Sequence, residues 1–581
     1  MTSVTEQYRA ARDFLLAPER TYAEAYEGFD WPRFEHFNFA LDWFDHLAKD
    51  PEVSQRNALV IREEDDSRTE RTYGDLSRAS NQVANWLREQ GAQRGDRVML
   101  MLDNRVELWE AILGCMKLGL VVCPTTTMLG RYEVQDRIDR AEIPWVVVAS
   151  EHAGTFAEVT GDYTLILVDD GTPEVGERTV LRFAHAYEAA DEFTPDQPTK
   201  ADELFLIYFT SGTTSLPKMV GHTHTTYPVG HLSSTYMTGC REGDIFLNIS
   251  APGWVAWAYS CFFSEFISGG TVFIYNYRRF DAAKTLQVMA EEGVTVFQAP
   301  ATVYRMMIRA GLELNTNPPR SAVSGGEPLD TFILKSVREA WGIDVRDIFG
   351  QTESTVILGT PLGIESQPGI TGRPVPGYEV KLVDPATGEE GDLGELCVKL
   401  KEGGAGITSG YVGDPDKTAE AFRDGYYHVG DIFSRNEEGL YSYVGRADEV
   451  FKSSDYRLSP FELETVLIEH PAVLEVAVVP SPDPIRLTVP KAYVVVAPDH
   501  EASAETAESI LRFGNERLAP YKRIRRLEFS EGFPKTVSGK IRRVELRNRE
   551  SELRPAGQDV PSVHGEFTED DFPGLRPQKK G

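Results

Sequence analysis

The stretch LFLIYFTSGTTSLPK, Leu204 to Lys218, joins an apolar run to a loop of small hydroxyl residues and glycine. Its first six residues are all aliphatic or aromatic, which is typical of a strand buried in a sheet. The loop that follows offers backbone N–H and hydroxyl donors at close range, because Gly212 has no side chain to block a polyanion. Lys218 adds a positive charge. The stretch therefore predicts a strand that ends in a triphosphate-binding loop.

The Walker P-loop is the nearest rival to this interpretation. It needs G-x-x-x-x-G-K-[ST], whereas Lys218 follows Pro217 and precedes Met219. An ordinary P-loop ATPase is therefore excluded. A serine- and threonine-rich surface turn that binds nothing stays open on this segment alone.

Helical and extended patterns alternate on both sides of this stretch. Apolar residues at helical spacing predict helices over 76–87, which Gly91 could terminate, and over 107–118. Short aliphatic runs predict buried strands at 97–102, 120–123, 145–149, 165–168, 204–209, 271–275, 294–297 and 347–350. This alternation predicts a layered α/β domain. Turn-rich segments after about residue 375 predict a β-rich subdomain.

The last hundred or so residues form a different pattern. A helix that begins at Pro460, strands at 473–479 and 491–497, and a helix over 507–518 predict a compact α+β unit. We therefore expect domains at 1–447 and 448–550. Residues 551–581 are rich in Pro, Gly and acidic side chains without periodicity, so we expect a poorly ordered tail.

Composition limits the classes of function. A chain of 581 residues is too long for one core. A net charge of −30 disfavours binding to nucleic acid or to anionic membranes. The five cysteines have no C-x-x-C spacing, so neither a zinc motif nor a disulfide framework is indicated. No apolar signal core or membrane span is recognisable, and we expect a soluble, cytoplasmic protein.

Four further segments contain residues that a nucleotide-activating site needs. The first two are DIFGQTES, Asp347 to Ser354, and YHVGD, Tyr427 to Asp431. Glu353 could bind Mg²⁺, and Asp431 could accept hydrogen bonds from two ribose hydroxyls. The other two are GRADEVFKSSDYRLSP, 445–460, and PKTVSGKIRR, 534–543. Each segment alone is a weak signal, but their joint occurrence in this order is specific.

These motifs resemble those of the acyl-adenylate-forming superfamily of acyl-CoA synthetases, adenylation domains and luciferases. The resemblance runs from about Phe37 to Arg547 and is strongest to medium-chain acyl-CoA synthetases, with FNFALDWFD at 37–45 and SPDPIR at 481–486 as further support. It implies a large N-terminal α/β domain with a β-rich subdomain and a small mobile C-terminal domain. It also implies ATP, Mg²⁺ and coenzyme A as substrates and activating ion.

The resemblance assigns roles to individual residues. Lys540 would neutralise charge as a carboxylate attacks the α-phosphate, and Lys218 and Glu353 would assist catalysis, with Thr213 and Glu353 as metal ligands. The residues that would bind ATP or AMP are Thr210, Ser211, Gly212, Thr213, Thr214, Lys218, Gly326, Glu327, Pro328, Asp347, Ile348, Phe349, Gly350, Gln351, Thr352, Asp431, Arg446 and Lys540.

The same resemblance implies a hinge at Asp448 and two further sets of contacts. Coenzyme A would meet Ser454, Asp455, Tyr456 and Arg486. The acyl pocket would contain Gly253, Trp254, Trp257, Ser324 and Gly325. His222 and His224 are assigned no role.

Three residues depart from the pattern of the family. Ser215 stands where glycine is usual in the phosphate loop, and Asp455 and Leu487 replace glycines that are common in the coenzyme A segments. Because Asp455 adds a negative charge near an anionic thiol carrier, these departures bear more on the coenzyme A site than on the ATP site.

The resemblance implies an ATP-dependent carboxylic acid–CoA ligase acting through an acyl-adenylate, with a medium-chain or similar small fatty acid favoured. An aryl acid ligase of the benzoate type and an adenylating enzyme that loads a carrier-protein thiol stay open. A luciferase-like oxygenase and a degenerate binding module are less favoured, the latter because Lys540, Glu353, Asp431 and Arg446 all occur together. The oligomeric state is left open, with a homodimer as one option.

Overall fold

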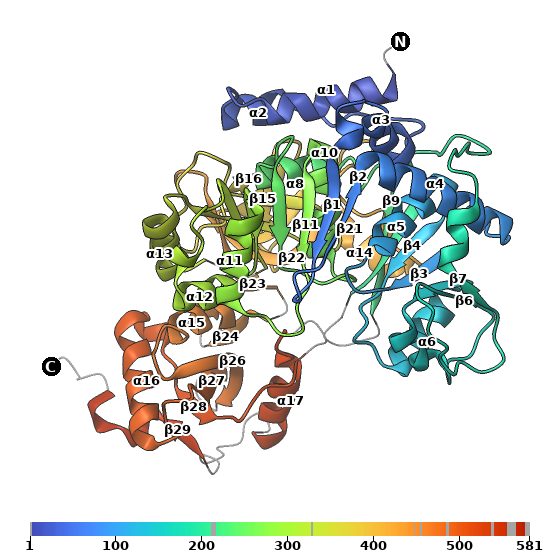
Figure 1. Cartoon of the computed structure of the whole chain (residues 1–581). Helices are drawn as coiled ribbons and strands as arrows, with labels where there is room; N and C mark the ends of the chain where they lie inside the picture. The colour runs from blue at the N-terminus through green and yellow to red at the C-terminus, as the bar shows by residue number, and fades with distance from the viewer. Residues whose placement is uncertain are drawn as a thin grey trace.

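A computed structural model describes residues 3–210, 217–326, 329–447, 449–453, 456–483, 487–535, 540–554 and 565–575. The larger, N-terminal part contains three β-sheets with helices around them, and the smaller C-terminal part, drawn in orange and red, lies to one side of it (Figure 1).

Two large mixed sheets form the centre of the N-terminal part. The first has nine strands in the order β16 (Arg373–Pro374), β15 (Val356–Gly359), β14 (Val345–Gly350), β13 (Ser321–Gly325), β12 (Val296–Gln298), β10 (Ile245–Asn248), β11 (Thr271–Tyr275), β1 (Asn57–Arg62) and β2 (Arg68–Thr72). The second has eight in the order β20 (Gly410–Tyr411), β9 (Lys218–Thr223), β8 (Leu204–Thr210), β4 (Val121–Pro124), β3 (Arg97–Met101), β5 (Trp145–Val148), β6 (Thr164–Leu167) and β7 (Val180–Arg182).

The third sheet is the β-rich subdomain. It contains β18 (Glu390–Gly391), β17 (Val380–Val383), β19 (Leu393–Lys399), β22 (Tyr426–Arg435) and β21 (Phe422–Arg423), and β23 (Tyr441–Arg446) also pairs with β22. These strands follow residue 375, as the turn-rich sequence there predicts.

Helices of the N-terminal part pack against the strands of both large sheets. They are α1 (Val4–Leu16), α2 (Tyr22–Gly28), α3 (Asp45–Ala48), α4 (Tyr73–Glu89), α5 (Val106–Leu118), α6 (Arg131–Arg140), α7 (Ser150–Ala153), α8 (His231–Thr238), α9 (Val255–Ala258), α10 (Ser264–Ser268), α11 (Ala282–Glu292), α12 (Ala301–Ala310), α13 (Thr331–Trp341) and α14 (Pro415–Ala421). No helix in the described ranges is both long and apolar enough to cross a lipid bilayer.

Local sequence explains where these helices begin and end. Thr72 and Asp75 form a reciprocal capping box that starts α4. Helix α5 ends where Gly119 adopts a left-handed conformation with φ of 82°, which glycine adopts at little steric cost. Trp43 and Trp109 are fully buried, and their indole N–H groups donate to the carbonyls of Phe266 and Cys261. These two large aromatic side chains are therefore buried with their polar edges hydrogen-bonded.

The C-terminal part is a small α+β unit. Its sheet has the order β26 (Val473–Asp483), β27 (Leu487–Val496), β28 (Arg526–Phe529) and β29 (Glu566–Thr568), and a hairpin of β24 (Phe451–Ser453) and β25 (Tyr456–Leu458) precedes it. Its helices are α15 (Pro460–Leu467), α16 (Ala504–Arg517) and α17 (Arg543–Leu553). The predicted fold class, a layered α/β domain with a β-rich subdomain and a small α+β unit, is confirmed.

The described parts of the predicted tail, residues 551–554 and 565–575, differ from the expectation of a poorly ordered segment. Residues 551–553 complete α17, and β29 pairs with β28. Glu566 in β29 is buried and forms ion pairs with Lys491 and Arg554. Acidic residues that composition assigns to solvent are thus part of a buried ionic network, which fixes this segment to the sheet.

Candidate active site

The predicted phosphate loop connects two strands of a hairpin. β8 and β9 are antiparallel, and Thr210 pairs with Lys218 across the loop. Of the residues predicted for this loop, Ser211, Gly212, Thr213 and Thr214 lie outside the described residues. The Lys218 ammonium lies 4.7 Å from the ring centroid of Tyr411 and 3.4 Å from its hydroxyl oxygen. The pairing of β20 with β9 brings Tyr411 to this position.

Tyr411 also connects the lysine to the predicted metal ligand. Its hydroxyl donates a hydrogen bond of 3.0 Å to Oε1 of Glu353. Burial is the main cause of the raised pKa of this phenol, and the charge of Glu353 raises it further, so the hydroxyl stays protonated and remains a donor. Tyr411 was not among the predicted site residues, since its position depends on the pairing of strands almost two hundred residues apart.

His222 supports the turn that carries Glu353. It is fully buried, and its Nε2 lies 2.7 Å from the carbonyl oxygen of Thr352. Burial lowers the pKa of this imidazole to about 4, so the ring is neutral at physiological pH and its Nε2–H can donate to Thr352. No role was predicted for His222 from the sequence. In the structure, its hydrogen bond to Thr352 stabilises the turn that carries Glu353.

The carboxylate of Asp431 contacts three neighbouring side chains. Antiparallel pairing of β22 and β23 puts it opposite Arg446, whose Nη1 lies 3.6 Å from Oδ1. The Tyr443 hydroxyl donates to Oδ1 at 3.2 Å, and Nε2 of Gln351 donates to Oδ2 and also to the Val429 carbonyl. Asp431, Arg446 and Gln351, predicted to lie together, do so. Tyr443 was not predicted.

Burial and nearby cations act in opposite directions on Asp431. Burial raises the pKa of its carboxyl to about 6, while the charges of Arg446 and Lys540 and the two hydrogen bonds lower it. Lys540 lies on the C-terminal unit and is exposed. Its positive charge is one of those that lower the pKa of Asp431, although it lies on a different unit of the chain.

The two segments predicted to hold adenine are neighbours. β13 and β14 are parallel, with Ser324 paired to Asp347 and Gly325 to Ile348. Ile348, Phe349 and Gly350 complete β14, which leads directly into Gln351 and Thr352. Gly326 has φ of 84°, a left-handed conformation that favours glycine, whereas Glu327 and Pro328 lie outside the described residues.

The predicted acyl-pocket residues have different environments. Gly253 has φ of 89°, and a Cβ atom there would lie 2.4 Å from the backbone nitrogen of Thr126, so the turn requires glycine. Trp254 is half-buried at the start of α9. Trp257 is 4 % exposed, packs on Trp109 and donates its indole N–H to Asn104, which makes it a core residue.

Ser324 is a different case, because it is fully buried and its hydroxyl has no hydrogen-bond partner among the described residues.

The structure describes little of the predicted hinge and coenzyme A site. Asp448, Ser454, Asp455 and Arg486 lie outside the described residues, and Tyr456 is the first residue of β25.

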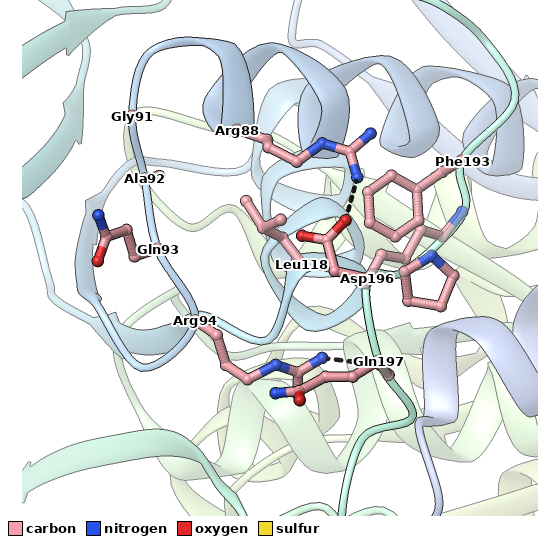
Figure 2. A pocket seen from close by; sticks show the side chains of 11 residues that line it. Arg88, Gly91, Ala92, Gln93, Arg94, Leu118, Phe193, Asp196 and Gln197 are labelled. Carbon is pink, nitrogen blue, oxygen red and sulfur yellow. Dashed lines mark hydrogen bonds and ion pairs between the residues drawn. The ribbon is translucent and has the colours of Figure 1, made fainter.

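A hollow of about 360 Å³ elsewhere on the N-terminal part contains none of the predicted site residues (Figure 2). Arg88, Arg94 and Phe193 contribute to its lining. Arg88 is paired with Asp196 at 3.2 Å and Arg94 with Glu203 at 2.6 Å. Because acidic partners balance these arginines, the hollow lacks the excess positive charge that a nucleotide triphosphate needs.

The match to family models agrees with this geometry. The model for AMP-binding enzymes matches residues 48–412, and the model for the C-terminal domain of AMP-binding enzymes matches residues 462–540. The chain belongs to the AMP-binding enzyme family. The predicted membership of the acyl-adenylate-forming superfamily is thereby confirmed.

Members of the AMP-binding enzyme family resemble this chain over nearly its whole length. A 4-hydroxybutyrate–CoA ligase of Metallosphaera sedula is 36 % identical over 96 % of this chain and 99 % of its own. The acyl-coenzyme A synthetase ACSM3 of Mus musculus is 34 % identical over 89 % of this chain and 91 % of its own. The crystal structure of the anthranilate CoA ligase AuaEII with anthranoyl-AMP superposes with a TM-score of 0.78 at 25 % identity, covering 89 % of this chain and 98 % of the other.

Proposed function

We propose that this chain is an ATP-dependent acid–CoA ligase that forms an acyl-adenylate and then an acyl-CoA thioester, with release of pyrophosphate and AMP. The observation that carries the proposal is the convergence of Lys218, Glu353 and Asp431 on the turn after β14. The charge of Lys540, on the C-terminal unit, also lowers the pKa of Asp431. The named acyl-CoA ligases and synthetases among the relatives support it.

The nucleotide would lie along the carboxyl end of β13 and β14. Asp431 would accept hydrogen bonds from both ribose hydroxyls in exchange for those that it now receives, and Arg446 would add a positive charge beside the ribose or α-phosphate. Adenine would pack between Gly326 to Pro328 and the Asp347 to Thr352 segment. The β- and γ-phosphates would bind Thr210 to Thr214 and Lys218.

The first step joins the acid to AMP. A carboxylate oxygen attacks the α-phosphorus in line, the bond to the bridging oxygen breaks, and pyrophosphate departs with the electron pair. The protein contributes positioning and charge neutralisation to such a displacement. Lys540 would neutralise charge at the attacking carboxylate and α-phosphate, and Lys218 would retain the pyrophosphate.

The residues present fit a magnesium ion on the phosphates. Glu353 supplies a carboxylate oxygen held in place by Tyr411, and oxygen donors are the ligands that Mg²⁺ prefers. Thr213 would be the second protein ligand. When bound, the ion supplies positive charge that offsets the charge developing on the leaving pyrophosphate.

The second step transfers the acyl group to a thiol. The thiol sulfur attacks the acyl carbon, AMP leaves with the electron pair of the broken C–O bond, and the thiol proton is released. Lys540 is not needed at this carbonyl, so rotation of residues 448–550 about Asp448 would withdraw it and bring in Ser454, Asp455, Tyr456 and Arg486 for coenzyme A. The domain bounds and the hinge are part of this proposal.

The acid is proposed to be a small or medium-chain carboxylic acid. Gly253, Trp254, Ser324 and Gly325 would line its pocket, with Trp257 packed behind them. An aryl acid is the second candidate, because the half-buried Trp254 offers a flat apolar surface and the anthranilate ligase is a structural neighbour.

One assay tests both steps. Pyrophosphate release and AMP formation would be measured with butyrate, 4-hydroxybutyrate, hexanoate, octanoate, benzoate and anthranilate, each with and without coenzyme A. Turnover that requires free coenzyme A supports the ligase. Adenylate formation without coenzyme A turnover would favour a carrier-protein loading enzyme, and absence of pyrophosphate release with every acid would refute the proposal.

A further inference from the structure

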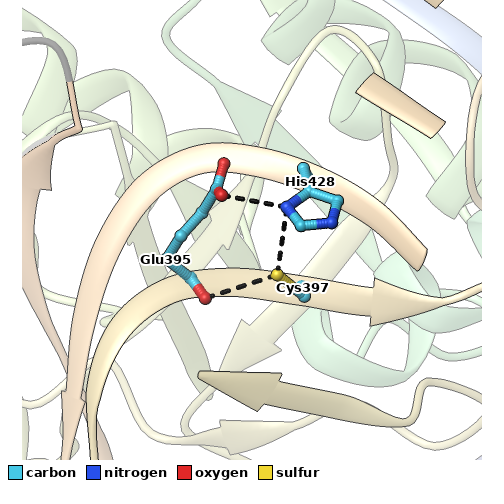
Figure 3. A group of neighbouring side chains, drawn as sticks. All are labelled: Glu395, Cys397 and His428. Atoms are coloured by element: carbon cyan, nitrogen blue, oxygen red, sulfur yellow. Dashed lines mark hydrogen bonds and ion pairs between the residues drawn. The ribbon is translucent and has the colours of Figure 1, made fainter. Parts of the chain in front are cut away.

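Three side chains that the proposed reaction does not use meet on one face of the β-rich subdomain: Glu395, Cys397 and His428 (Figure 3). Glu395 and Cys397 lie two residues apart on β19, and His428 is the register partner of Cys397 on β22. Strand pairing, not a local spacing motif, brings them together. The absence of C-x-x-C in the sequence therefore does not exclude a site of this kind.

One potential ligand atom of each of the three groups lies within 4.8 Å of the other two. His428 Nδ1 lies 3.4 Å from Cys397 Sγ and 2.9 Å from Glu395 Oε2. Tetrahedral zinc with its usual bond lengths separates a sulfur and a nitrogen ligand by about 3.6 Å, and a nitrogen and an oxygen ligand by about 3.3 Å. Shifts of a few tenths of an ångström would admit the ion.

The chemistry of the donor set favours zinc among common divalent ions. A thiolate, an imidazole and a carboxylate are all zinc ligands, whereas Mg²⁺ and Ca²⁺ select oxygen alone. Cys397 is 0 % and Glu395 7 % exposed, so the ligands are partly shielded from water and preorganised by the sheet. Three protein ligands leave the fourth tetrahedral position open to water or another ligand.

The neighbouring groups are compatible with an added cation. Arg423 Nη2 lies 3.4 Å from Glu395 Oε2, and its side chain is 44 % exposed, so it can move into solvent when the carboxylate binds another cation. The other carboxylate oxygen, Oε1, accepts the backbone N–H of Gly430 at 3.0 Å. Glu395 can thus bind an ion through Oε2 and keep its bond to Gly430, which precedes Asp431 in β22.

We propose that Glu395, Cys397 and His428 form a three-ligand zinc site between β19 and β22, close to Asp431 on β22. The thiol loses its proton when it binds the ion, as cysteine ligands of zinc do. The bound ion would join β19 to β22 and, through Glu395, restrain the part of β22 that contains Gly430 and Asp431. This site is separate from the magnesium site on the phosphates.

Cobalt binding tests the proposal directly, because a thiolate on Co²⁺ gives a charge-transfer absorption in the near ultraviolet. The full chain, treated with a chelator and kept reduced without nucleotide, would be titrated with Co²⁺ and then with Zn²⁺. We expect one equivalent of cobalt with this absorption, displaced by zinc. No charge-transfer absorption with the parent protein would overturn the proposal.

Variants assign the site to its ligands. Cys397→Ser should abolish the absorption, and His428→Gln should weaken zinc binding by at least about tenfold, since even outer-shell changes cost that much. Cys240→Ser is the matched control, because Cys240 is also fully buried and bonds a serine hydroxyl instead of histidine. Its absorption should equal that of the parent.

Two results keep the test decisive if Cys397→Ser folds poorly. Circular dichroism and ATP binding report folding, and His428→Gln then gives an independent measurement of zinc affinity. Unchanged zinc affinity in a folded His428→Gln variant, or cobalt absorption retained in Cys397→Ser, would overturn the proposal. His152→Ala removes the histidine of the exposed Asp103, Glu151 and His152 cluster, and it should leave the absorption unchanged.

Discussion

The ring of Tyr443 packs edge-on against Phe461, with centroids 4.9 Å apart and planes at 87°. Tyr443 lies on β23 of the N-terminal part, and its hydroxyl donates to Asp431. Phe461 lies in the first turn of α15, on the C-terminal unit. One side chain thus contacts both the proposed ribose-binding carboxylate and the unit that carries Lys540.

Phe461→Ala should therefore disfavour the arrangement in which Lys540 faces the nucleotide. An edge-to-face aromatic pair contributes about 0.5–1.5 kcal/mol beyond its buried area, which corresponds to about a 2- to 12-fold fall in the rate of adenylate formation. Thioester formation from supplied acyl-adenylate should be unchanged. Pyrophosphate exchange into ATP measures the first step, and acyl-CoA appearance measures the second.

Phe513→Ala provides the control for this variant. Phe513 contacts His470 at 5.2 Å and 86°, so the pair has the same geometry but lies entirely within the C-terminal unit. It should lower thermal stability without changing the ratio of the two rates. The coupling is refuted if Phe461→Ala slows both steps equally, or if Phe513→Ala changes the ratio as much.

Lys540→Ala should reduce adenylate formation by about a hundredfold or more, because it removes a positioned charge from the first transition state. Thioester formation from supplied acyl-adenylate should remain near the parent rate. Lys535→Ala is the matched control: this lysine precedes Lys540 by five residues and pairs with Glu475 at 2.8 Å. A comparable loss in both steps for Lys540→Ala would contradict rotation about Asp448.

Tyr411→Phe removes the hydroxyl between Lys218 and Glu353 and keeps the ring under the ammonium. A hydrogen bond to a charged group contributes about 1.5–3 kcal/mol, so kcat/KM for ATP should fall by about tenfold or more. The deficit should shrink as Mg²⁺ is raised if the hydroxyl orients Glu353 toward the ion.

Tyr426→Phe is the control for this change. The ammonium of Lys381 lies 3.9 Å from the centroid of Tyr426, which resembles the lysine–tyrosine contact of the site but lies in the β-rich subdomain. It should retain the parent kcat/KM. Unchanged kinetics in Tyr411→Phe at limiting Mg²⁺ would show that the hydroxyl does not hold the metal ligand.

The fold follows from patterns that lie within one segment. Apolar runs such as 204–209 and 97–102 became β8 and β3, because their side chains can be buried only inside a covered sheet. β29 could not be predicted, because its burial depends on residues in other segments of the chain. It has three residues, and Glu566 is buried only because Lys491 and Arg554 neutralise it from elsewhere in the chain.

The residues of the candidate site also fall into those that the sequence predicts and those that it does not. Asp431 and Gln351 could be predicted because motifs carry them, whereas Tyr411 and Tyr443 have no local signal. Their hydroxyls reach Glu353 and Asp431 through pairings of β20 with β9 and of β23 with β22. Partners that depend on strand register require the three-dimensional structure.

The acidity of Asp431 should appear in the pH dependence of the reaction. Its pKa is raised by burial to about 6, so the carboxyl is ionised above that pH and protonated below it. Only the carboxylate can accept hydrogen bonds from both ribose hydroxyls. kcat/KM for ATP should therefore be level above about pH 7 and fall toward tenfold per unit below about pH 6. Asp431→Asn should be weak throughout and lack this inflection, and the same inflection in that variant would assign it to another group.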